Sequence, residues 1–458
     1  MTSLTVLIGY DFLTTLPYIG KRGAERFDFL QEMLNQLDMS VQLDDDPGRT
    51  FDIQRLFALH NNVFPNQLVN HIEVDLNIPA VRQMIEDYLR DVGLFIGYEL
   101  SASSRRCLDA LNIPYLDVWF SPLRFGKDAQ FSLHSNVAAI NEVLNRHAVP
   151  EETFQAEADA LAGYCRHFLP VGHQISADSA LLIGQLFIDK ASQCGDRFVS
   201  LLDYVTELKQ IATQHSALYL LKHPLMSEAD FIKVRNALAA IDNLHYLQGA
   251  NVYQLMADER ITRVIAVSSS VVLEARYFSK QTEYLYQPVL GEEYVHVRDA
   301  FYSSRFWCEL LNQKIKSHWH YFHCDNWLRA KFDAFYAYGL FTSELFAGSK
   351  HKRRLEDYQA LVNAATVVDN LPSAGRLVLY GAGSVGGLIL PALKPRIAAV
   401  IDKGLSDNGV KQWHGVPVWE TSELQDGDLI LIGAFKYRQQ IEVDLATCGK
   451  QLEIFSLG

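Results

Sequence analysis

Apolar and polar positions along the first part of the chain predict strands and helices in turn. Apolar runs with the length of buried strands lie at 5–10, 93–100 and 115–120, and segments with helical spacing lie at 27–37 and 103–111. Strands that alternate with helices form parallel sheets with crossover connections. Residues 1–172 are therefore predicted to form a Rossmann-like α/β domain.

The pattern begins again after a less regular stretch near 150–175. Strands are predicted at 179–187, 217–221, 243–248 and 261–267, and helices at 198–215, from Ser227 onward and at 271–278. Aromatic residues are frequent at 300–345, which is predicted to be helical. We expect a second Rossmann-like domain at 173–348, whose strand ends face the first domain across a cleft.

The end of the chain predicts a third, smaller unit. A basic, polar linker helix is expected within 349–375, and a small Rossmann-like domain at 376–458. Gly381, Gly383 and Gly386 follow a predicted strand and open a helix, and Asp402 ends the next strand about 20 residues further on, as in dinucleotide-binding sites. The segment is long enough for one mononucleotide-binding half, so an unassigned bound nucleotide and a structural appendage both remain open.

Composition and charge narrow the class of protein. The chain has 458 residues, of which 49% are hydrophobic, and carries a formal net charge of −13. This charge argues against binding nucleic acid over a broad surface, so an anionic ligand needs a few local groups. The scattered cysteines and the lack of a basic, apolar leader or a long uncharged helix predict a cytoplasmic protein.

Polar residues follow two of the predicted strands of the second domain. The strand 217–221 ends on Lys222, His223 and Pro224, and the strand 261–267 ends on Ser268–Ser270 before a helix. Ligands of open α/β sheets bind at the carboxyl ends of the strands, and hydroxyl groups beside free helix N–H groups suit phosphate. The two turns are predicted to flank one phosphate-binding cleft, and a polar strand end with an ordinary helix cap is the alternative.

Four short segments in this order resemble a known family. GQLFIDKAS (184–192), KHP (222–224), NVYQL (251–255) and SSSVVLEA (268–275) are similar to segments of bacterial GT-B sialyltransferases and Kdo transferases, whose HP and SS motifs contact the phosphate of a CMP-sugar. The layout is most similar to capsule and lipopolysaccharide β-Kdo transferases, including glycosyltransferase family 99. The resemblance covers roughly residues 1–345.

This resemblance implies an α/β, GT-B-like pair of Rossmann-type domains, here followed by the small third domain. It implies retaining transfer of Kdo (3-deoxy-D-manno-oct-2-ulosonic acid) from CMP-Kdo, in β-linkage, to a lipopolysaccharide O-antigen or capsule glycan. The partners would be the CMP-sugar and a glycan or lipid-linked glycan, with peripheral association at the inner membrane and no nucleic acid. No cofactor would be required.

The resemblance also assigns roles on the donor side. His223, Ser269 and Ser270 would contact the phosphate, with Lys222 and Ser268 beside them. Gln185 and Asp189 match a Q-x-x-x-D pattern of the β-Kdo enzymes. Departure of CMP builds positive charge at the anomeric carbon, and a carboxylate such as Asp189 can stabilise that charge or form a covalent intermediate. A helix N-terminal acid held by backbone N–H groups is the alternative.

Three further residues are candidates for the nucleotide pocket. Glu274 would hold the ribose or cap the site, or is an ordinary helix-surface acid. Asn251 and Tyr253 would line the base pocket, although Tyr253 fits a core aromatic equally well.

The acceptor side is expected in the first domain. Glu99, at a strand end, is the first candidate for the general base that takes the proton of the acceptor hydroxyl, and Asp117 is the second. Either is alternatively a cap or turn acid. Arg124 would bind a sugar carboxylate, because a planar guanidinium matches a carboxylate in a two-bond fork.

Two clusters resemble metal sites, yet no metal is expected. Asp44–Asp46 contains the D-x-D of metal-dependent glycosyltransferases, but a CMP donor has no diphosphate for a metal to bridge, which favours a solvated turn. The cluster of His318, His320, His323 and Cys324 lacks a second matched pair of ligands.

Two other functions remain open. An inverting, sialyltransferase-like enzyme would use another CMP-nonulosonate. In a protein of a different class, an NAD(P)-dependent oxidoreductase or nucleotide sensor, the glycine-rich third domain would be the functional part.

Overall fold

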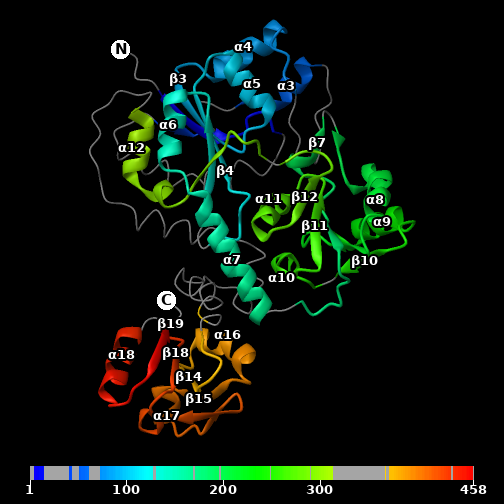
Figure 1. Ribbon diagram of the computed structural model, residues 1–458. Helices are drawn as coiled ribbons and strands as arrows, with labels where there is room; N and C mark the ends of the chain where they lie inside the picture. Colours follow the sequence, from blue (N-terminus) through cyan, green and yellow to red (C-terminus); the bar gives the residue numbers. More distant parts are fainter. Residues whose placement is uncertain are drawn as a thin grey trace.

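Three α/β units make up the computed structural model (Figure 1). The structure describes residues 5–14, 41–43, 51–60, 73–126, 130–168, 171–194, 197–247, 249–288, 290–312, 367, 371–434 and 437–456. The predicted helix 27–37, most of the linker 349–375, the acidic triplet Asp44–Asp46 and the cluster His318–Cys324 lie outside these ranges.

The first unit is built on a mixed sheet of order β13-β5-β4-β3-β1-β2. Its strands are β1 (Thr5–Tyr10), β2 (Val41–Leu43), β3 (Val92–Tyr98), β4 (Tyr115–Phe120), β5 (Phe131–Ser135) and β13 (Val295–Val297). The strands β1 to β4 are parallel, β5 pairs antiparallel with β4, and β13 pairs antiparallel with β5 at the edge. The predicted strands at 5–10 and 115–120 are confirmed at their bounds.

Alternate residues of each strand point to opposite faces of this sheet, and both faces are covered. Leu7 and Phe95 face a layer made of α3 (Ile53–Leu59), α4 (Pro79–Tyr88) and α5 (Ala102–Ala110). Ile8 and Ile96 face α6 (Ala138–Arg146) and α12 (Ser304–Asn312). A parallel strand buried on both faces reads as a continuous apolar run, which is why the sequence pattern located it.

Two segments differ from their predicted positions. The strand β13 and the helix α12, placed by the sequence in the domain 173–348, pack on the sheet of the first unit because Val297, Phe306 and Trp307 complete its apolar face. The stretch near 150–175 contains α7 (Glu151–Phe168), whose buried residues Phe154 and Leu161 follow helical spacing. The chain therefore returns to the first unit after building the second.

The second unit has a fully parallel sheet of order β10-β9-β6-β11-β12. Its strands are β6 (Ser179–Ile183), β9 (Ala217–Leu221), β10 (Leu244–Leu247), β11 (Ile261–Ala266) and β12 (Gln281–Tyr284). Its α-helices include α8 (Val205–Ala212), α9 (Glu228–Leu238), α10 (Val252–Ala257) and α11 (Val271–Ala275). In sequence order the strands run 3-2-1-4-5, the Rossmann order, which reverses between β6 and β11.

The third unit repeats this strand order in its five parallel strands, β17-β15-β14-β18-β19, and β16 is added antiparallel beside β17 at the edge. Its strands are β14 (Leu377–Tyr380), β15 (Ile397–Ile401), β16 (Gln412–Trp413), β17 (Val416–Trp419), β18 (Leu429–Ile432) and β19 (Glu453–Ser456). Its α-helices are α16 (Ser384–Leu393), α17 (Lys403–Asp407) and α18 (Arg438–Thr447). The predicted α/β class, with three Rossmann-type units, is confirmed.

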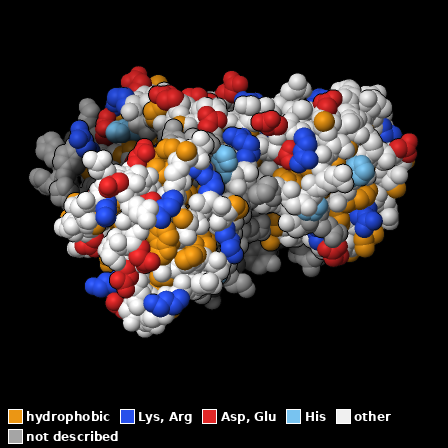
Figure 2. Space-filling view, turned by 60° about the horizontal axis from the view of Figure 1, so that its bottom comes forward, with side chains coloured by type: hydrophobic (Ala, Val, Ile, Leu, Met, Phe, Trp, Pro, Cys, Tyr) orange, Lys and Arg blue, Asp and Glu red, His pale blue; other side chains and the backbone are white. Residues whose placement is uncertain are grey.

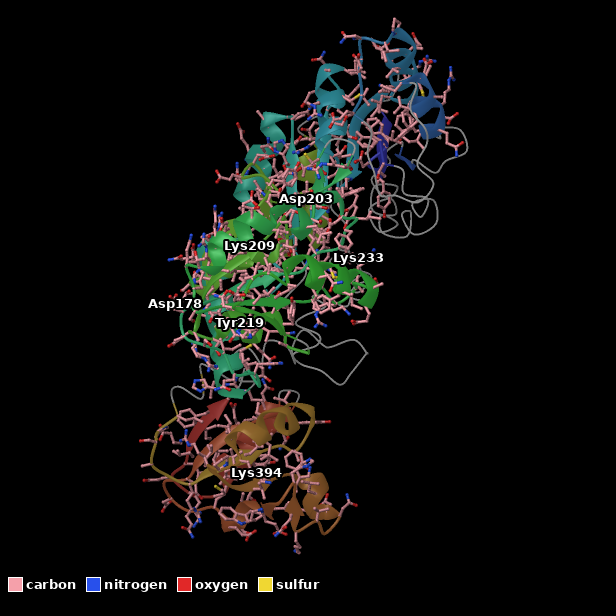
Figure 3. All side chains as sticks on the ribbon, turned by 90° about the vertical axis from the view of Figure 1, so that its right-hand side faces the viewer. Asp178, Asp203, Lys209, Tyr219, Lys233 and Lys394 are labelled. Atoms are coloured by element: carbon pink, nitrogen blue, oxygen red, sulfur yellow. The ribbon has the colours of Figure 1, made fainter. Side chains whose placement is uncertain are left out.

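Helix α7 connects the units. It packs on α10 of the second unit and on α16 of the third, so that Phe154, Leu161 and Ile389 belong to one apolar cluster. The third unit lies at one end of the molecule in Figures 1 and 3. Among the described residues, no helix combines the length and the apolar character that a membrane span requires.

Figure 2 shows acidic and basic side chains interspersed over one face of the molecule. This face presents no continuous field of one sign. A charged ligand approaching it must therefore be recognised by local groups, as the net charge also implies.

We expect Gly184→Ala to destabilise the protein, because Gly184 lies where β6 and β9 end side by side. Its N–H donates to the Leu221 carbonyl at 2.8 Å, and an added Cβ would lie 2.7 Å from that oxygen and 3.0 Å from the backbone nitrogen of His223. The expected cost is about 1–3 kcal/mol, measured by urea unfolding. Gly172→Ala is the control, since nothing lies within 4 Å of a Cβ there. Equal stability of the two variants would contradict this account.

Candidate functional site

A cavity of about 210 Å³ lies between the first and second units. The first unit lines it with Glu99, Trp119, Phe120, Pro122 and Arg124, and the second with Gln185, Asp189, Lys190, Ala191, His223 and Ser268–Ser270, together with Leu290. Most of these residues follow the carboxyl ends of β3, β4, β6, β9 and β11. The cavity thus occupies the position at which open α/β sheets bind ligands.

Gln185 connects the turns that follow β6 and β11. Its amide group donates to Ser268 Oγ at 2.7 Å, and its carbonyl oxygen accepts the Ser268 N–H at 3.0 Å. Ser268 is fully buried, whereas Ser269 and Ser270 are half-buried and line the cavity. Gln185 therefore fixes the serine turn, and the hydroxyl groups of Ser269 and Ser270 are the ones placed to meet a ligand.

Asp189 is half-buried at the cavity and caps a short 3-10 helix, Lys190–Ser192. Its Oδ1 accepts the Ala191 N–H at 3.0 Å, and its Oδ2 lies 3.3 Å from the Gln185 amide nitrogen. The carboxylate is thus oriented by two groups of its own unit. It is a helix cap and also lines the cavity.

His223 lines the cavity from the end of β9. Its Nδ1 accepts the Leu225 N–H at 3.1 Å, which assigns the ring hydrogen to Nε2. Burial lowers the pKa of His223, and Arg124 lowers it further while Asp189 opposes the shift. The neutral ring therefore offers one N–H donor to a ligand at neutral pH.

Glu99 lies opposite, directly after β3, with a backbone φ of 55°. Its carbonyl oxygen accepts from Lys190 Nζ, which also lies 2.8 Å from Asp11 Oδ2. Asp11 follows β1, and the order of the first sheet reverses between β1 and β3. The reversal points of both sheets therefore meet at the cavity, joined by Lys190.

Arg124 is exposed at the cavity, between the units. Its backbone N–H donates to Glu274 Oε1 at 2.6 Å, and its guanidinium carbon lies 5.9 Å from the centroid of the Phe120 ring. The loop that carries Arg124 is thus anchored to the second unit, while the guanidinium faces the cavity's solvent.

Several predicted site residues lie outside the cavity lining. Asp117 is fully buried and accepts from the Leu100 N–H, Trp119 Nε1 and Tyr294 hydroxyl at 3.0, 3.1 and 2.5 Å. Burial raises the pKa of Asp117 to about 6. The structure thus places Asp117 behind Trp119, where it orients the indole and has no exposed surface for a substrate.

The residues predicted to contact the base and the ribose of the donor are also buried inside the protein. Tyr253 is fully buried and donates its hydroxyl to Glu274 Oε1 at 2.8 Å, and Glu274 is 1% exposed. Asn251 caps α10 by accepting the Tyr253 N–H at 2.9 Å. Lys222 pairs with Glu228, outside the cavity lining. The interpretation of Tyr253 as a core aromatic fits the structure, and Glu274 is an internal residue rather than a helix-surface acid.

The glycine-rich turn of the third unit has the expected backbone. Gly381 has a φ of +108°, and a Cβ on Gly386 would lie 2.1 Å from the Gly381 carbonyl oxygen, so both positions need glycine. Nothing lies within 4 Å of a Cβ on Gly383. Asp402 accepts the Ala382 N–H at 2.8 Å and the Leu405 N–H at 3.1 Å. The carboxylate therefore stabilises the turn and caps α17.

Sequence reasoning missed Asp11, which pairs with Lys190, and the lining residues Lys190, Trp119, Phe120, Pro122, Ala191 and Leu290. Asp11 directly follows the first predicted strand, and Lys190 directly follows Asp189, so each stands where a strand-end rule points. Within the described ranges, no group of three His, Cys, Asp or Glu side chains is arranged to hold a metal ion.

Comparisons with known proteins find remote structural similarity. The sequence matches no protein-family profile and no curated protein. Among solved structures, the β-Kdo 2,7 transferase KpsC of Thermosulfurimonas dismutans has 10% identity, with 60% of this chain and 76% of that chain covered and a TM-score of 0.31.

Two other solved structures are similar at the same remote level. The UDP-GlcNAc 2-epimerase of Neisseria meningitidis bound to UDP-GlcNAc has 9% identity, coverage of 60% and 80%, and a TM-score of 0.20. One chain of the dipicolinate synthase of Bacillus halodurans has 10% identity, coverage of 69% and 98%, and a TM-score of 0.17. At these values an activity must be inferred from the site itself.

We expect Glu274→Gln to stabilise the protein at high pH. Burial raises the pKa of Glu274 to about 7 from the usual 4.5, so between these values the folded state binds more protons than the unfolded chain and stability falls as pH rises. Glutamine keeps an acceptor oxygen for Arg124 and Tyr253 but does not ionise.

The expected gain in unfolding free energy is up to about 3 kcal/mol at pH 8 and vanishes below pH ~4.5. It is measured by urea unfolding across this range, with the exposed Glu207→Gln on α8 as control. A gain that does not vary with pH would show that ionisation of Glu274 is not its cause.

Proposed function

We propose that this protein is a glycosyltransferase that transfers Kdo, or a related ulosonate, from a CMP-activated donor to a surface glycan with retention. One observation carries the proposal: His223, Ser269, Ser270 and Asp189 of one sheet edge line a single cavity opposite Glu99 of the other. This is a donor half and an acceptor half facing each other. The acceptor would be a lipopolysaccharide or capsule glycan, in free or lipid-linked form at the inner membrane.

The half of the cavity that would bind the CMP-sugar offers hydrogen-bond donors to a monophosphate. The Nε2–H of His223 and the hydroxyl groups of Ser269 and Ser270 would bind the phosphate of CMP. The Arg124 guanidinium at the same cavity would bind the carboxylate of the ulosonate. The chain has a net charge of −13, so its overall field does not attract an anionic ligand, and these local groups would have to bind it.

Retention follows if the reaction passes through two inversions. In the first, an Asp189 oxygen bonds the anomeric carbon while the carbon–oxygen bond to phosphate breaks and its electron pair leaves with CMP. In the second, the acceptor oxygen bonds that carbon, the bond to Asp189 breaks with its electron pair returning to the carboxylate, and the acceptor proton passes to Glu99. CMP leaves without needing a proton, so Glu99 acts in the second step.

Consumption of CMP-Kdo, compared with CMP-sialic acid and other CMP-nonulosonates, tests the proposal. We expect CMP release from CMP-Kdo to be fastest. Release from none of these donors would overturn the proposed function, and an inverted product from a nonulosonate would favour the sialyltransferase-like alternative.

We expect His223→Ala to reduce kcat/KM for the CMP donor by about ten- to a hundredfold, because a hydrogen bond to a charged group contributes roughly 1.5–3 kcal/mol. Initial rates of CMP release measure the effect. His245→Ala is the matched control, since His245 is exposed on β10 of the same sheet. An unchanged kcat/KM in His223→Ala would exclude the phosphate contact.

We expect CMP-Kdo without acceptor to leave one Kdo residue covalently attached at Asp189. Intact-mass analysis after a rapid quench, followed by peptide mapping, detects the adduct. Asp189→Asn should abolish it and retain CMP binding, whereas the exposed Asp242→Asn should behave as the wild type. Full transfer activity in Asp189→Asn would rule out its covalent role.

A further inference from the structure

Lys190 spans the cleft from the second unit to the first. Its ammonium lies 2.8 Å from Asp11 Oδ2 and donates to the Glu99 carbonyl oxygen. The Lys190 side chain is 15% exposed and that of Asp11 is 1% exposed. Two charges that are this well buried are costly to desolvate, so the pair is expected to add little to the stability of the fold.

On the side of the second unit, the backbone of Lys190 is held by its neighbour. Lys190 begins the short helix that Asp189 caps, and Asp189 is itself oriented by Ala191 and Gln185. The ammonium therefore extends from a fixed point directly beside the proposed nucleophile.

On the side of the first unit, Asp11 and Glu99 depend on Lys190 to different degrees. Asp11 also accepts the Ser101 N–H at 2.9 Å, the Leu13 N–H at 3.2 Å and the hydroxyl of Ser104. It keeps these partners if the ammonium is removed. Glu99 keeps the hydrogen bond from its N–H to the Val118 carbonyl at 3.0 Å, but its backbone is left-handed, which is unfavourable for a residue with a side chain, and its carbonyl oxygen is held by Lys190.

We propose that Lys190 is a positioning residue that holds Glu99 opposite Asp189. This proposal rests on the proposed function. It assigns Lys190 to the second inversion, in which a water or acceptor hydroxyl loses its proton to Glu99 and the sugar leaves Asp189. The first inversion needs Asp189 and the phosphate contacts, which belong mainly to the second unit and do not depend on the ammonium. Lys190 thus acts on the second inversion alone, through Glu99, and takes no part in the making or breaking of a bond.

Hydrogen exchange tests the positioning role without reference to activity. In Lys190→Met, peptides that cover 97–104 should exchange at least about tenfold faster, whereas the strand 217–221 should be unchanged. Lys190→Arg should restore protection. Lys233→Met is the control, because it removes an exposed ion pair with Asp230 on α9 of the same unit (Figure 3). Unchanged exchange at 97–104 in Lys190→Met would overturn the proposal.

Rapid-quench kinetics with CMP-Kdo test the chemical consequence. Lys190→Met should release the first equivalent of CMP within about threefold of the wild-type rate, and then turn over at least about tenfold more slowly, with the adduct on Asp189 accumulating. Lys190→Arg should recover turnover. Equal loss in both phases would overturn the assignment to the second step. If the wild type releases no CMP, the proposed function fails, and hydrogen exchange alone decides whether Lys190 holds Glu99.

Discussion

Parallel strands end at a common edge of their sheet, and this constraint creates the site. The backbone ladder joins β6 to β9 on one side and to β11 on the other, so the turns after all three strands must lie side by side. Gly184 lets the first two turns approach closely, and Gln185 then reaches the Ser268 turn. The same constraint places Asp11 and Glu99 together at the edge of the other sheet. Everything proposed for the chemistry depends on these two edges meeting.

Buried carboxylates hold the two edges together. Asp11 accepts three hydrogen bonds from its own unit and pairs with Lys190 of the other. Glu274 of the second unit accepts the Arg124 N–H of the first and the Tyr253 hydroxyl of its own. Asp117 supports the indole of Trp119 from behind. Burying a carboxylate is costly unless donors surround it, so each of these contacts specifies one arrangement of the cavity wall.

The covalent connections reinforce this arrangement. Helix α7 leads from the first unit along α10 and meets α16, so the third unit packs on the helix that joins the other two. After the second unit and before the third, the chain returns through β13 and α12 to the first sheet. In the third unit Asp402 satisfies backbone N–H groups of its own turn, a structural use of the residue that the dinucleotide pattern would assign to a ribose.

The sequence by itself determined the strands, their alternation with helices and the polar residues at the strand ends, because buried parallel strands are continuous apolar runs. Only the tertiary structure decided which acids open on the cavity. Glu99 and Asp117 are both acids in or after apolar strands, yet Glu99 lines the cleft and Asp117 is sealed behind Trp119. The sequence likewise did not predict that Lys190 pairs with Asp11 or that β13 returns to the first sheet. Local periodicity indicates which face of a helix or strand is buried. The exposure and the partners of a side chain between two units depend instead on segments that are distant in the chain.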